Sequence, residues 1–309
     1  MQFISKFLFH CEFEKHLSKK TLKAYTIDLN QFKVFIKTRN VEQITKVNKD
    51  DLKQYLQHIS SFKPKTIKRK IATLKALYNF LEFEEIIETN PFRKVRIKIK
   101  EPLILPKVMD LQEATELFNA AYFDLSNTKH KEDSQSYKEV IRNIAVLELL
   151  FGTGVRVSEL CSLKKANIGP GFSFVRVNGK GNKERIIQIL NKDIITALER
   201  YHDLFSSQIK TQEYFFVNRL GMRLSEQSVR FMIRKYKEKC MFQKNITPHM
   251  FRHTFATLLL EQDVDIKYIQ NILGHSSILT TQIYTHVSTE KQTDILQNKH
   301  PRNDVKLSL

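Results

Sequence analysis

Apolar residues recur at steps of three and four through the first ninety residues of this chain, which is the spacing of one face of an amphipathic helix. The clearest run follows Ser18, a predicted N-cap, and contains Leu22, Tyr25, Leu29, Phe32 and Ile36. A second helix is predicted to open at Asn48, and a third carries a stripe from Ile67 to Leu81 before Asn90-Pro91 stops it. These patterns predict a small all-helical domain over residues 1–95.

The rest of the chain is also mainly helical by pattern. Asp110 and Glu113 have the spacing of a capping box, and residues 124–136 are polar and patternless, as in a surface loop. The two convincing strands are residues 172–178 and 183–190, which alternate and are joined by a glycine-rich turn. A chain of 309 residues is long enough for two cores. We therefore expect a mainly α fold with a small β-sheet and a second domain over residues 108–290.

Basic residues outnumber acidic ones by 51 to 33, which gives a net charge of +18. That excess argues against an ordinary enzyme of small acids or sugars and favours a polyanionic partner. One basic cluster lies at the start of the third predicted helix, off its apolar stripe: Lys63, Lys65, Lys68, Arg69 and Lys70. A second basic run includes Arg96 and leads into a proline-bounded segment that we interpret as a linker over residues 96–107. A solvated helix face would explain the first cluster alone, but both together favour contact with nucleic-acid phosphates.

Several other classes of protein are disfavoured. The three cysteines are far apart and lack CxxC spacing, which favours a reducing, cytoplasmic setting. No apolar run approaches the roughly 18 residues of a membrane span, and we expect no signal peptide. The glycine pairs match neither a dinucleotide fingerprint nor a nucleotide P-loop. His249 and His253 have the spacing of metal ligands, but Met250 stands where a zinc hydrolase has its glutamate, so we expect no metal and no cofactor.

Five short motifs occur in a fixed order in the last half of the chain. They are GTGVRVSEL, NGKGNKER, HMFRH, LGHSS and TTQIYTHV. Together they resemble the motifs of the tyrosine recombinase (phage integrase) family. The resemblance places the six catalytic positions of that family at Arg156, Lys180, His249, Arg252, His275 and Tyr284. The segments LSKKTLKAYTIDLNQF and KPKTIKRKIATLKALYNFL look like the core-binding, SAM-like domain of the same family, and the NKHPR tail resembles that of its Xer subgroup.

The resemblance implies a specific chemistry. Tyr284 would attack a DNA phosphodiester and conserve its energy as a 3′-phosphotyrosyl ester. Arg156 and Arg252 would stabilise the charge that builds on the phosphate oxygens. His249 would accept the phenol proton, Lys180 would protonate the departing 5′ oxygen, and His275 would donate a hydrogen bond to the phosphate.

The family also implies an assembly. We expect a tetramer on two duplex recombination sites, formed by this chain alone or together with a related recombinase, in the nucleoid. Residues 291–309 form a tail that is either exchanged between protomers through Ile295 and Leu296 or frayed. Two alternatives to recombination stay open: a type IB topoisomerase-like nicking and closing enzyme, and a catalytically silent DNA-binding relative. The biological outcome, whether integration, excision or dimer resolution, also stays open.

Overall fold

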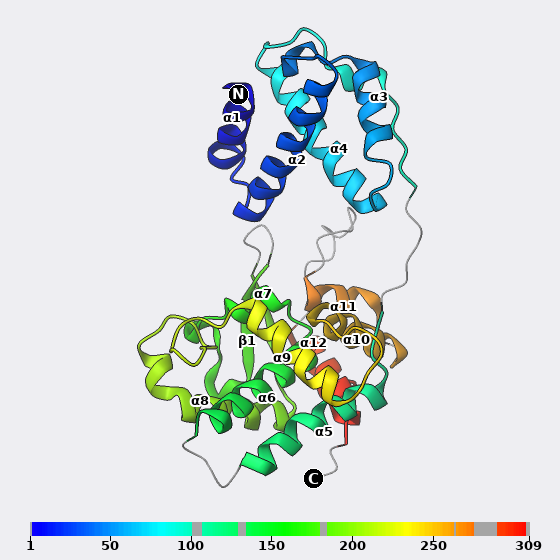
Figure 1. The fold of residues 1–309 in the computed structure, drawn as a ribbon. Helices are drawn as coiled ribbons and strands as arrows, with labels where there is room; N and C mark the ends of the chain where they lie inside the picture. The colour runs from blue at the N-terminus through cyan, green and yellow to red at the C-terminus, as the bar shows by residue number, and fades with distance from the viewer. Residues whose placement is uncertain are drawn as a thin grey trace. The chain divides into compact units, whose positions relative to one another are not determined.

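The structure is a computed structural model that describes residues 2–100, 107–128, 134–179, 184–262, 264–274 and 289–306. The chain divides into two compact units, Met1–Ile104 and Leu105–Leu309, each with its own hydrophobic core. Figure 1 shows the described elements of both units. None of the described helices is long and apolar enough to cross a membrane.

The N-terminal unit is all helical, as its apolar spacing predicts. Its helices are α1 (Gln2–Phe9), α2 (Lys19–Thr38), α3 (Lys49–His58) and α4 (Pro64–Phe83), with short turns of helix at His10–Glu14, Ile44–Lys46 and Pro91–Lys94. The predicted caps are confirmed: the Ser18 hydroxyl accepts a hydrogen bond from the Thr21 amide, and Asn48 forms a capping box with Asp51. The sequence pattern did not indicate α1, whose Phe7 ring packs on Tyr25.

The segment after Pro91–Lys94 packs on this unit. Val95, Ile97 and Ile99 lie partly buried against the N-terminal core, and the alternate residues Arg96 and Lys98 are exposed. This is the two-residue alternation of an extended chain with one apolar face. The first residues of the segment that we expected to be a linker are therefore attached to the N-terminal unit.

The C-terminal unit is built around a central helix. Its elements are α5 (Leu111–Thr128), α6 (Gln135–Thr153), α7 (Val157–Cys161), β1 (Phe174–Asn178), β2 (Glu184–Gln188), α8 (Lys192–Lys210), α9 (Glu226–Lys239), α10 (Pro248–Glu261), α11 (Ile266–Leu273) and α12 (Thr289–Asn298), with short turns at Lys165–Asn167, Pro170–Phe172 and Pro301–Asp304. Helix α6 is buried along most of its length and packs against α5, α8 and α10. The fold class is therefore as expected, mainly α with one small sheet.

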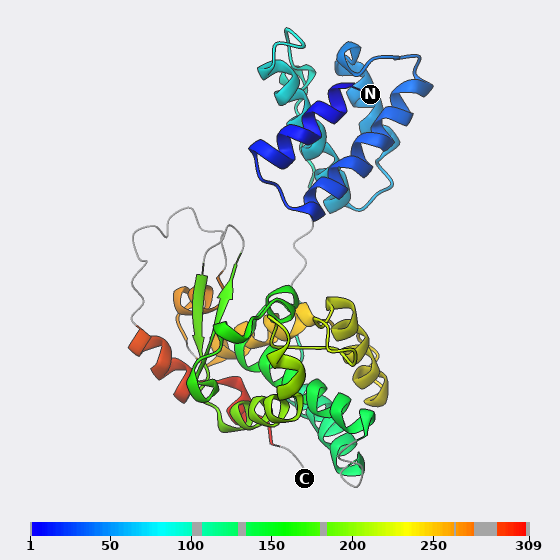
Figure 2. The same ribbon diagram turned by 90° about the vertical axis from the view of Figure 1, so that its left-hand side faces the viewer.

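The two strands form an antiparallel hairpin whose register pairs Phe174 with Gln188 and Asn178 with Glu184. Helices α11 and α12 both contact β2, and Figure 2 shows the hairpin from the side. The hairpin thus lies beside the C-terminal end of α11. This neighbourhood holds the candidate active site.

One expectation about this unit is wrong. Residues 124–128, which we expected in a surface loop, form the last turns of α5, and Ser134 then caps α6. Leu125 is buried and continues the apolar stripe of Phe118 and Ala121, so packing holds this polar stretch in a helix.

The end of the chain folds back onto the core of the same unit. Ile295, Leu296 and Val305 are buried there, and the Arg302 guanidinium is 1% exposed against the fully buried Glu148 carboxylate. Residues 295–305 are therefore packed, not frayed.

Candidate active site

Arg156 is the N-cap residue of α7, two residues after the left-handed Gly154 that ends α6. Its backbone amide donates to one carboxylate oxygen of Glu159 at 2.8 Å, and its Nη1 donates to the other at 2.7 Å. Glu159 thus closes the first turn of α7 and also holds the guanidinium. The Arg156 side chain is 29% exposed, which leaves part of it open to a substrate.

Arg252 lies on α10, which begins with Thr247 as N-cap and Pro248 in its first turn. The side chain is buried, and its Nη1 donates a hydrogen bond of 2.8 Å to the Gly154 carbonyl. Its Nη2 donates to the Leu273 carbonyl. Burial, and then the positive charge of Arg156, lower the pKa of Arg252 from its ordinary value of 12.5.

Both arginines are held at the C-terminal ends of helices. Gly154 ends α6 and Gly274 ends α11, each with a positive φ near 60° that favours glycine. The last carbonyls of a helix carry partial negative charge and lack partners within the helix, so they attract guanidinium groups. A Cβ atom at Gly154 would lie 2.8 Å from the Phe255 ring, so this close approach of α6 and α10 requires a glycine.

Two charged residues that the sequence analysis missed complete the cluster. Arg185 on β2 donates two hydrogen bonds to the Glu159 carboxylate, at 3.0 and 2.8 Å. Glu159 and Arg185 both lie inside quoted motifs, RVSEL and NGKGNKER, but nothing in their local spacing indicated that they would meet. Among the described residues, two guanidiniums of this cluster, those of Arg156 and Arg185, contact the Glu159 carboxylate. The third, that of Arg252, binds backbone carbonyls instead.

His249 lies in the first turn of α10 and is exposed. His253, one turn later, is partly buried, and burial followed by the nearby His249 lowers its pKa. Three of the predicted catalytic residues, Lys180, His275 and Tyr284, lie outside the described residues. The structure therefore brings together Arg156 and Arg252 and places His249 on the same helix as Arg252. No group of three or more potential metal ligands occurs among the described side chains.

The basic cluster on α4 separates into two kinds of residue. Lys63, Lys65 and Lys68 are exposed at the start of the helix, as is Arg96 further along the chain. Arg69 is 43% exposed along its side chain, and its Nη1 pairs with Asp28.

The expectation that Lys70 contacts DNA is corrected. Its side chain is 4% exposed, and its ammonium donates to the fully buried Asp28 carboxylate at 3.2 Å and to Gln31 on α2. A buried carboxylate requires a partner, and the Lys70 charge is used inside the fold. We assign Lys70 to the packing of α4 on α2.

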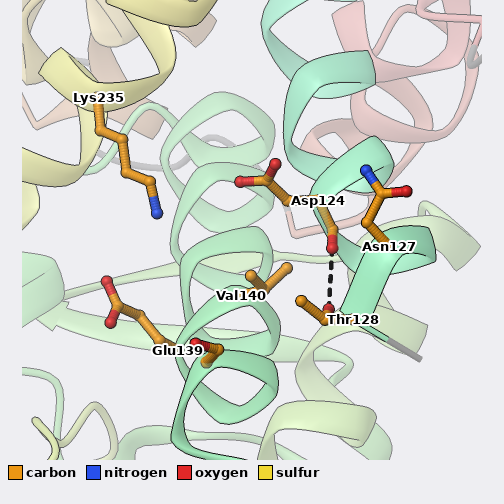
Figure 3. A pocket seen from close by; sticks show the side chains of 7 residues that line it. Asp124, Asn127, Thr128, Glu139, Val140 and Lys235 are labelled. Atoms are coloured by element: carbon orange, nitrogen blue, oxygen red, sulfur yellow. Dashed lines mark hydrogen bonds between the residues drawn. The ribbon is translucent and has the colours of Figure 1, made fainter. Parts of the chain in front are cut away.

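A pocket of about 200 Å³ lies at another part of this unit, between α5, α6 and α9. Figure 3 shows Asp124, Glu139 and Lys235 among the residues of its wall, and the Thr128 hydroxyl bonded to the Asp124 carbonyl. Two carboxylates in its lining make it unsuited to a phosphate. None of the predicted catalytic residues lines it.

Comparison with known proteins identifies the same family that the motifs of this site resemble. The profile described as "Phage integrase family" matches residues 124–291, and "Phage integrase, N-terminal SAM-like domain" matches residues 4–85. A tyrosine recombinase of Agathobacter rectalis is 45% identical over 302 residues, which cover 97% of each chain. This chain belongs to the phage integrase family. It is a site-specific tyrosine recombinase, which cuts and rejoins DNA.

One further relative supports the same assignment, and two solved structures show the same fold. Tyrosine recombinase XerC of Bacillus pumilus is 33% identical over 303 residues, 96% of this chain and 95% of the relative. The crystal structure of XerH bound to a palindromic difH substrate has a TM-score of 0.70 at 20% identity and covers 94% of this chain and 83% of that one. A lambda integrase dimer bound to a COC′ core site has a TM-score of 0.67 at 17% identity, with 89% and 94% covered. Both structures share the fold.

Proposed function

We propose that this recombinase cuts DNA by attack of Tyr284 on a phosphodiester held between Arg156 and Arg252. The observation that carries the proposal is the charge of the cluster. Among the described residues, the guanidiniums of Arg156 and Arg185 share the Glu159 carboxylate, and the Arg252 guanidinium lies within the influence of these charges without a carboxylate partner of its own. Such a cluster has an excess of positive charge that is partly withdrawn from water. A phosphate that gains negative charge during the reaction would compensate that excess.

The proposed reaction conserves the number of bonds to phosphorus. The Tyr284 oxygen forms a bond to phosphorus, and the bond from phosphorus to the 5′ oxygen breaks, which leaves a 3′-phosphotyrosyl ester. His249, exposed in the first turn of α10, is the proposed acceptor of the phenol proton. Lys180 is the proposed donor to the departing 5′ oxygen, and His275 the donor of a hydrogen bond to the phosphate. Attack by a 5′ hydroxyl of the other duplex reverses the steps and rejoins the strand.

The exposed basic residues of the N-terminal unit are the proposed contacts to the DNA backbone. Lys63, Lys65, Lys68, Arg69 and Arg96 present their charge at or near the surface of one compact unit. Contacts of this kind add salt-dependent affinity without sequence preference.

We also propose that the chain acts as a tetramer on two recombination sites, in the nucleoid. A solved relative supports this, since one lambda integrase structure is a tetramer bound to a Holliday junction. Residues 291–309 are the proposed segment exchanged between protomers, anchored by Ile295 and Leu296. In a single chain these two side chains are buried in their own core, so exchange would transfer an existing packing arrangement to a neighbour.

The test is incubation with a pool of nicked duplexes from the host chromosome, followed by denaturing electrophoresis and mass mapping of any adduct. We expect an adduct on the peptide that contains Tyr284. Tyr284→Phe should bind the same duplex and form no adduct, and the matched control Tyr268→Phe on α11 should react as wild type. An adduct elsewhere, or an undiminished adduct in Tyr284→Phe, would contradict the proposal.

The same preparation separates the alternatives. Joined products that combine strands of two duplexes indicate recombination. Relaxation of supercoiled plasmid without such products would indicate a topoisomerase-like enzyme, and tight binding without any adduct would indicate a silent DNA-binding relative.

A further inference from the structure

The Arg185 guanidinium lies next to the proposed catalytic arginines and is held by several hydrogen bonds. Arg185 is the second residue of β2, and its side chain is 10% exposed. Its Nε donates to the Ile272 carbonyl at 2.8 Å, and Nη1 and Nη2 donate to the two oxygens of Glu159. Three of its five N–H donors thus bind protein atoms, in a two-pronged geometry that lysine cannot reproduce.

The carboxylate that Arg185 binds is the one that holds Arg156. Glu159 Oε1 accepts from Arg156 Nη1 at 2.7 Å and from Arg185 Nη1 at 3.0 Å. Burial alone would raise the pKa of Glu159, but Arg185 and then Arg156 hold it below its ordinary value, so the carboxylate stays charged. Because Arg185 shares this charge, Arg156 is not neutralised by a full carboxylate of its own.

Arg185 also belongs to a second, ordered set of contacts. Three consecutive carbonyls at the C-terminal end of α11 each accept from a different arginine: Ile272 from Arg185, Leu273 from Arg252 and Gly274 from Arg156. A Cβ atom at Gly274 would lie 3.1 Å from the Arg185 guanidinium, so the glycine lets the helix end approach β2. Arg185 therefore connects the hairpin, the end of α11 and the start of α7.

We propose that Arg185 is a positioning residue for DNA cleavage: it shares Glu159 with Arg156 and fixes the end of α11, and so holds Arg156 and Arg252 in the geometry that binds the phosphate. The proposal rests on the proposed function of those two arginines. Arg185 acts through Glu159 and the α11 carbonyls, not by touching DNA. Its loss leaves Glu159 to draw Arg156 away from the phosphate.

The experiment measures the single-turnover cleavage rate at saturating duplex, the Kd of the same duplex and the thermal unfolding temperature. The duplex is one on which the wild-type chain forms its covalent adduct. We expect Arg185→Met to lower the cleavage rate roughly 10- to 100-fold, with a Kd within about threefold of wild type. Arg185→Lys keeps the charge but loses the two-pronged geometry of the guanidinium, so its cleavage rate should lie between those of the wild type and Arg185→Met. Arg176→Met, which removes an arginine from the other strand of the same hairpin, should keep the wild-type rate at saturation.

A second substitution separates positioning from a merely structural role. Adding Glu159→Gln to Arg185→Met removes the carboxylate that would hold Arg156, so the double variant should cleave several-fold faster than Arg185→Met alone. A structural role predicts the opposite, because a second loss in the network would lower the unfolding temperature and the rate further. Wild-type rates in both Arg185 variants, or a double variant no faster than Arg185→Met, would overturn the proposal.

A third variant, Arg156→Met, distinguishes failure of the proposed function from failure of the role proposed for Arg185. Arg156→Met should abolish cleavage if Arg156 binds the reacting phosphate. If Arg156→Met cleaves normally, the proposed function is wrong. If Arg156→Met is inactive and Arg185→Met cleaves normally, only the role of Arg185 is wrong. Where Arg185→Met does not fold, the comparison of Arg185→Lys with and without Glu159→Gln decides between positioning and structure in the same way.

Discussion

The Arg252 guanidinium donates a hydrogen bond of 2.8 Å to the carbonyl of Gly154, 98 residues earlier in the chain. This bond joins the end of α6 to the face of α10, and a second bond from the same guanidinium reaches the end of α11 at Leu273. The two anchored nitrogens fix the plane of the guanidinium. A side chain that keeps the charge but loses this plane should therefore fail in catalysis.

We expect Arg252→Lys to lower the single-turnover cleavage rate by roughly 10²- to 10³-fold, the usual effect of removing one aligned donor from a transition state. DNA affinity should change little, because the proposed contacts to the DNA backbone are on other residues. Rate and Kd are measured on the same nicked duplex, with Arg234→Lys on the exposed side of α9 as control. Cleavage at the wild-type rate in Arg252→Lys would show that charge alone suffices.

Lys65 and Lys70 both lie in the first half of α4, yet they should behave differently. Lys70→Met leaves the buried Asp28 with Arg69 and Thr73 but without its ammonium partner, so stability should fall by roughly 1–3 kcal/mol. Its effect on the salt dependence of DNA binding should be small, since the ammonium is not at the surface.

Lys65→Met is the matched comparison. It removes an exposed ammonium, so stability should change by no more than about 0.5 kcal/mol, while the slope of log K against log salt becomes shallower by about 0.9 if one phosphate contact is lost. Urea unfolding and gel-shift titrations over a range of salt concentrations measure both quantities. If Lys70→Met gave a shallower slope of log K against log salt at unchanged stability, the correction would be wrong and Lys70 would be a DNA contact.

His300 should make the stability of the C-terminal unit depend on pH, with a loss of stability in acid. Its Nε2 bonds to the Gly152 carbonyl and its Nδ1 accepts from the Arg302 amide at 3.0 Å, so both nitrogens are used by the neutral ring. Burial lowers the pKa of His300 to about 4, against an ordinary 6.5. The unfolded chain therefore binds the proton first, and the contribution of this residue is present above pH 6.5 and lost as the pH falls from 6.5 toward 4.

The expected loss at pH 4.5, relative to pH 7.5, is roughly 2–3 kcal/mol from His300 alone. Hydrogen exchange of α6 peptides, measured at several pH values in wild type and in His300→Gln, isolates the contribution of His300 to the pH dependence of stability. The variant should be less stable than wild type at neutral pH and should lose less on acidification. Equal pH dependence in the two chains would contradict a neutral, buried His300.

The Arg302 and Glu148 side chains form a buried ion pair that fastens the end of the chain. Two bonds of 2.8 and 2.9 Å join them, and the Tyr122 hydroxyl donates to the same carboxylate at 2.9 Å. Arg302→Met leaves a buried carboxylate without its cation, which typically costs about 3–5 kcal/mol. We expect earlier proteolytic release of the C-terminal segment in this variant.

The double variant Glu148→Met/Arg302→Met tests the reason for that loss. It removes both charges, so it should recover much of the stability lost in Arg302→Met. Limited proteolysis and urea unfolding compare wild type with both variants. A double variant less stable than Arg302→Met would show that the two side chains contribute through packing and not through charge.

Local patterns predicted most of the elements of this recombinase. The stripe from Leu22 to Ile36, the caps Ser18 and Asn48 and the stop at Gly274 depend on neighbours within one or two turns, and all of them are present in the structure. The motifs around Arg156, Arg252 and Tyr284 were enough to recognise the family, because they are short runs of residues. Helix α1 was missed because eight residues give a weak periodic signal, and its place depends on the rings of Tyr25 and Phe80.

Only the tertiary structure decided which charges are paired inside the fold and which remain exposed at the surface. Lys70 cannot be distinguished from Lys68 by its neighbours in sequence, since its partner Asp28 lies 42 residues away on another helix. Arg185 reaches Glu159 across 26 residues and Ile272 across 87. An ion pair between distant segments depends on how helices and strands pack, and its strength depends on the water that the packing removes. The sequence by itself determined most of the helices and the family, whereas packing determined the contacts of Lys70, Arg185 and Arg302.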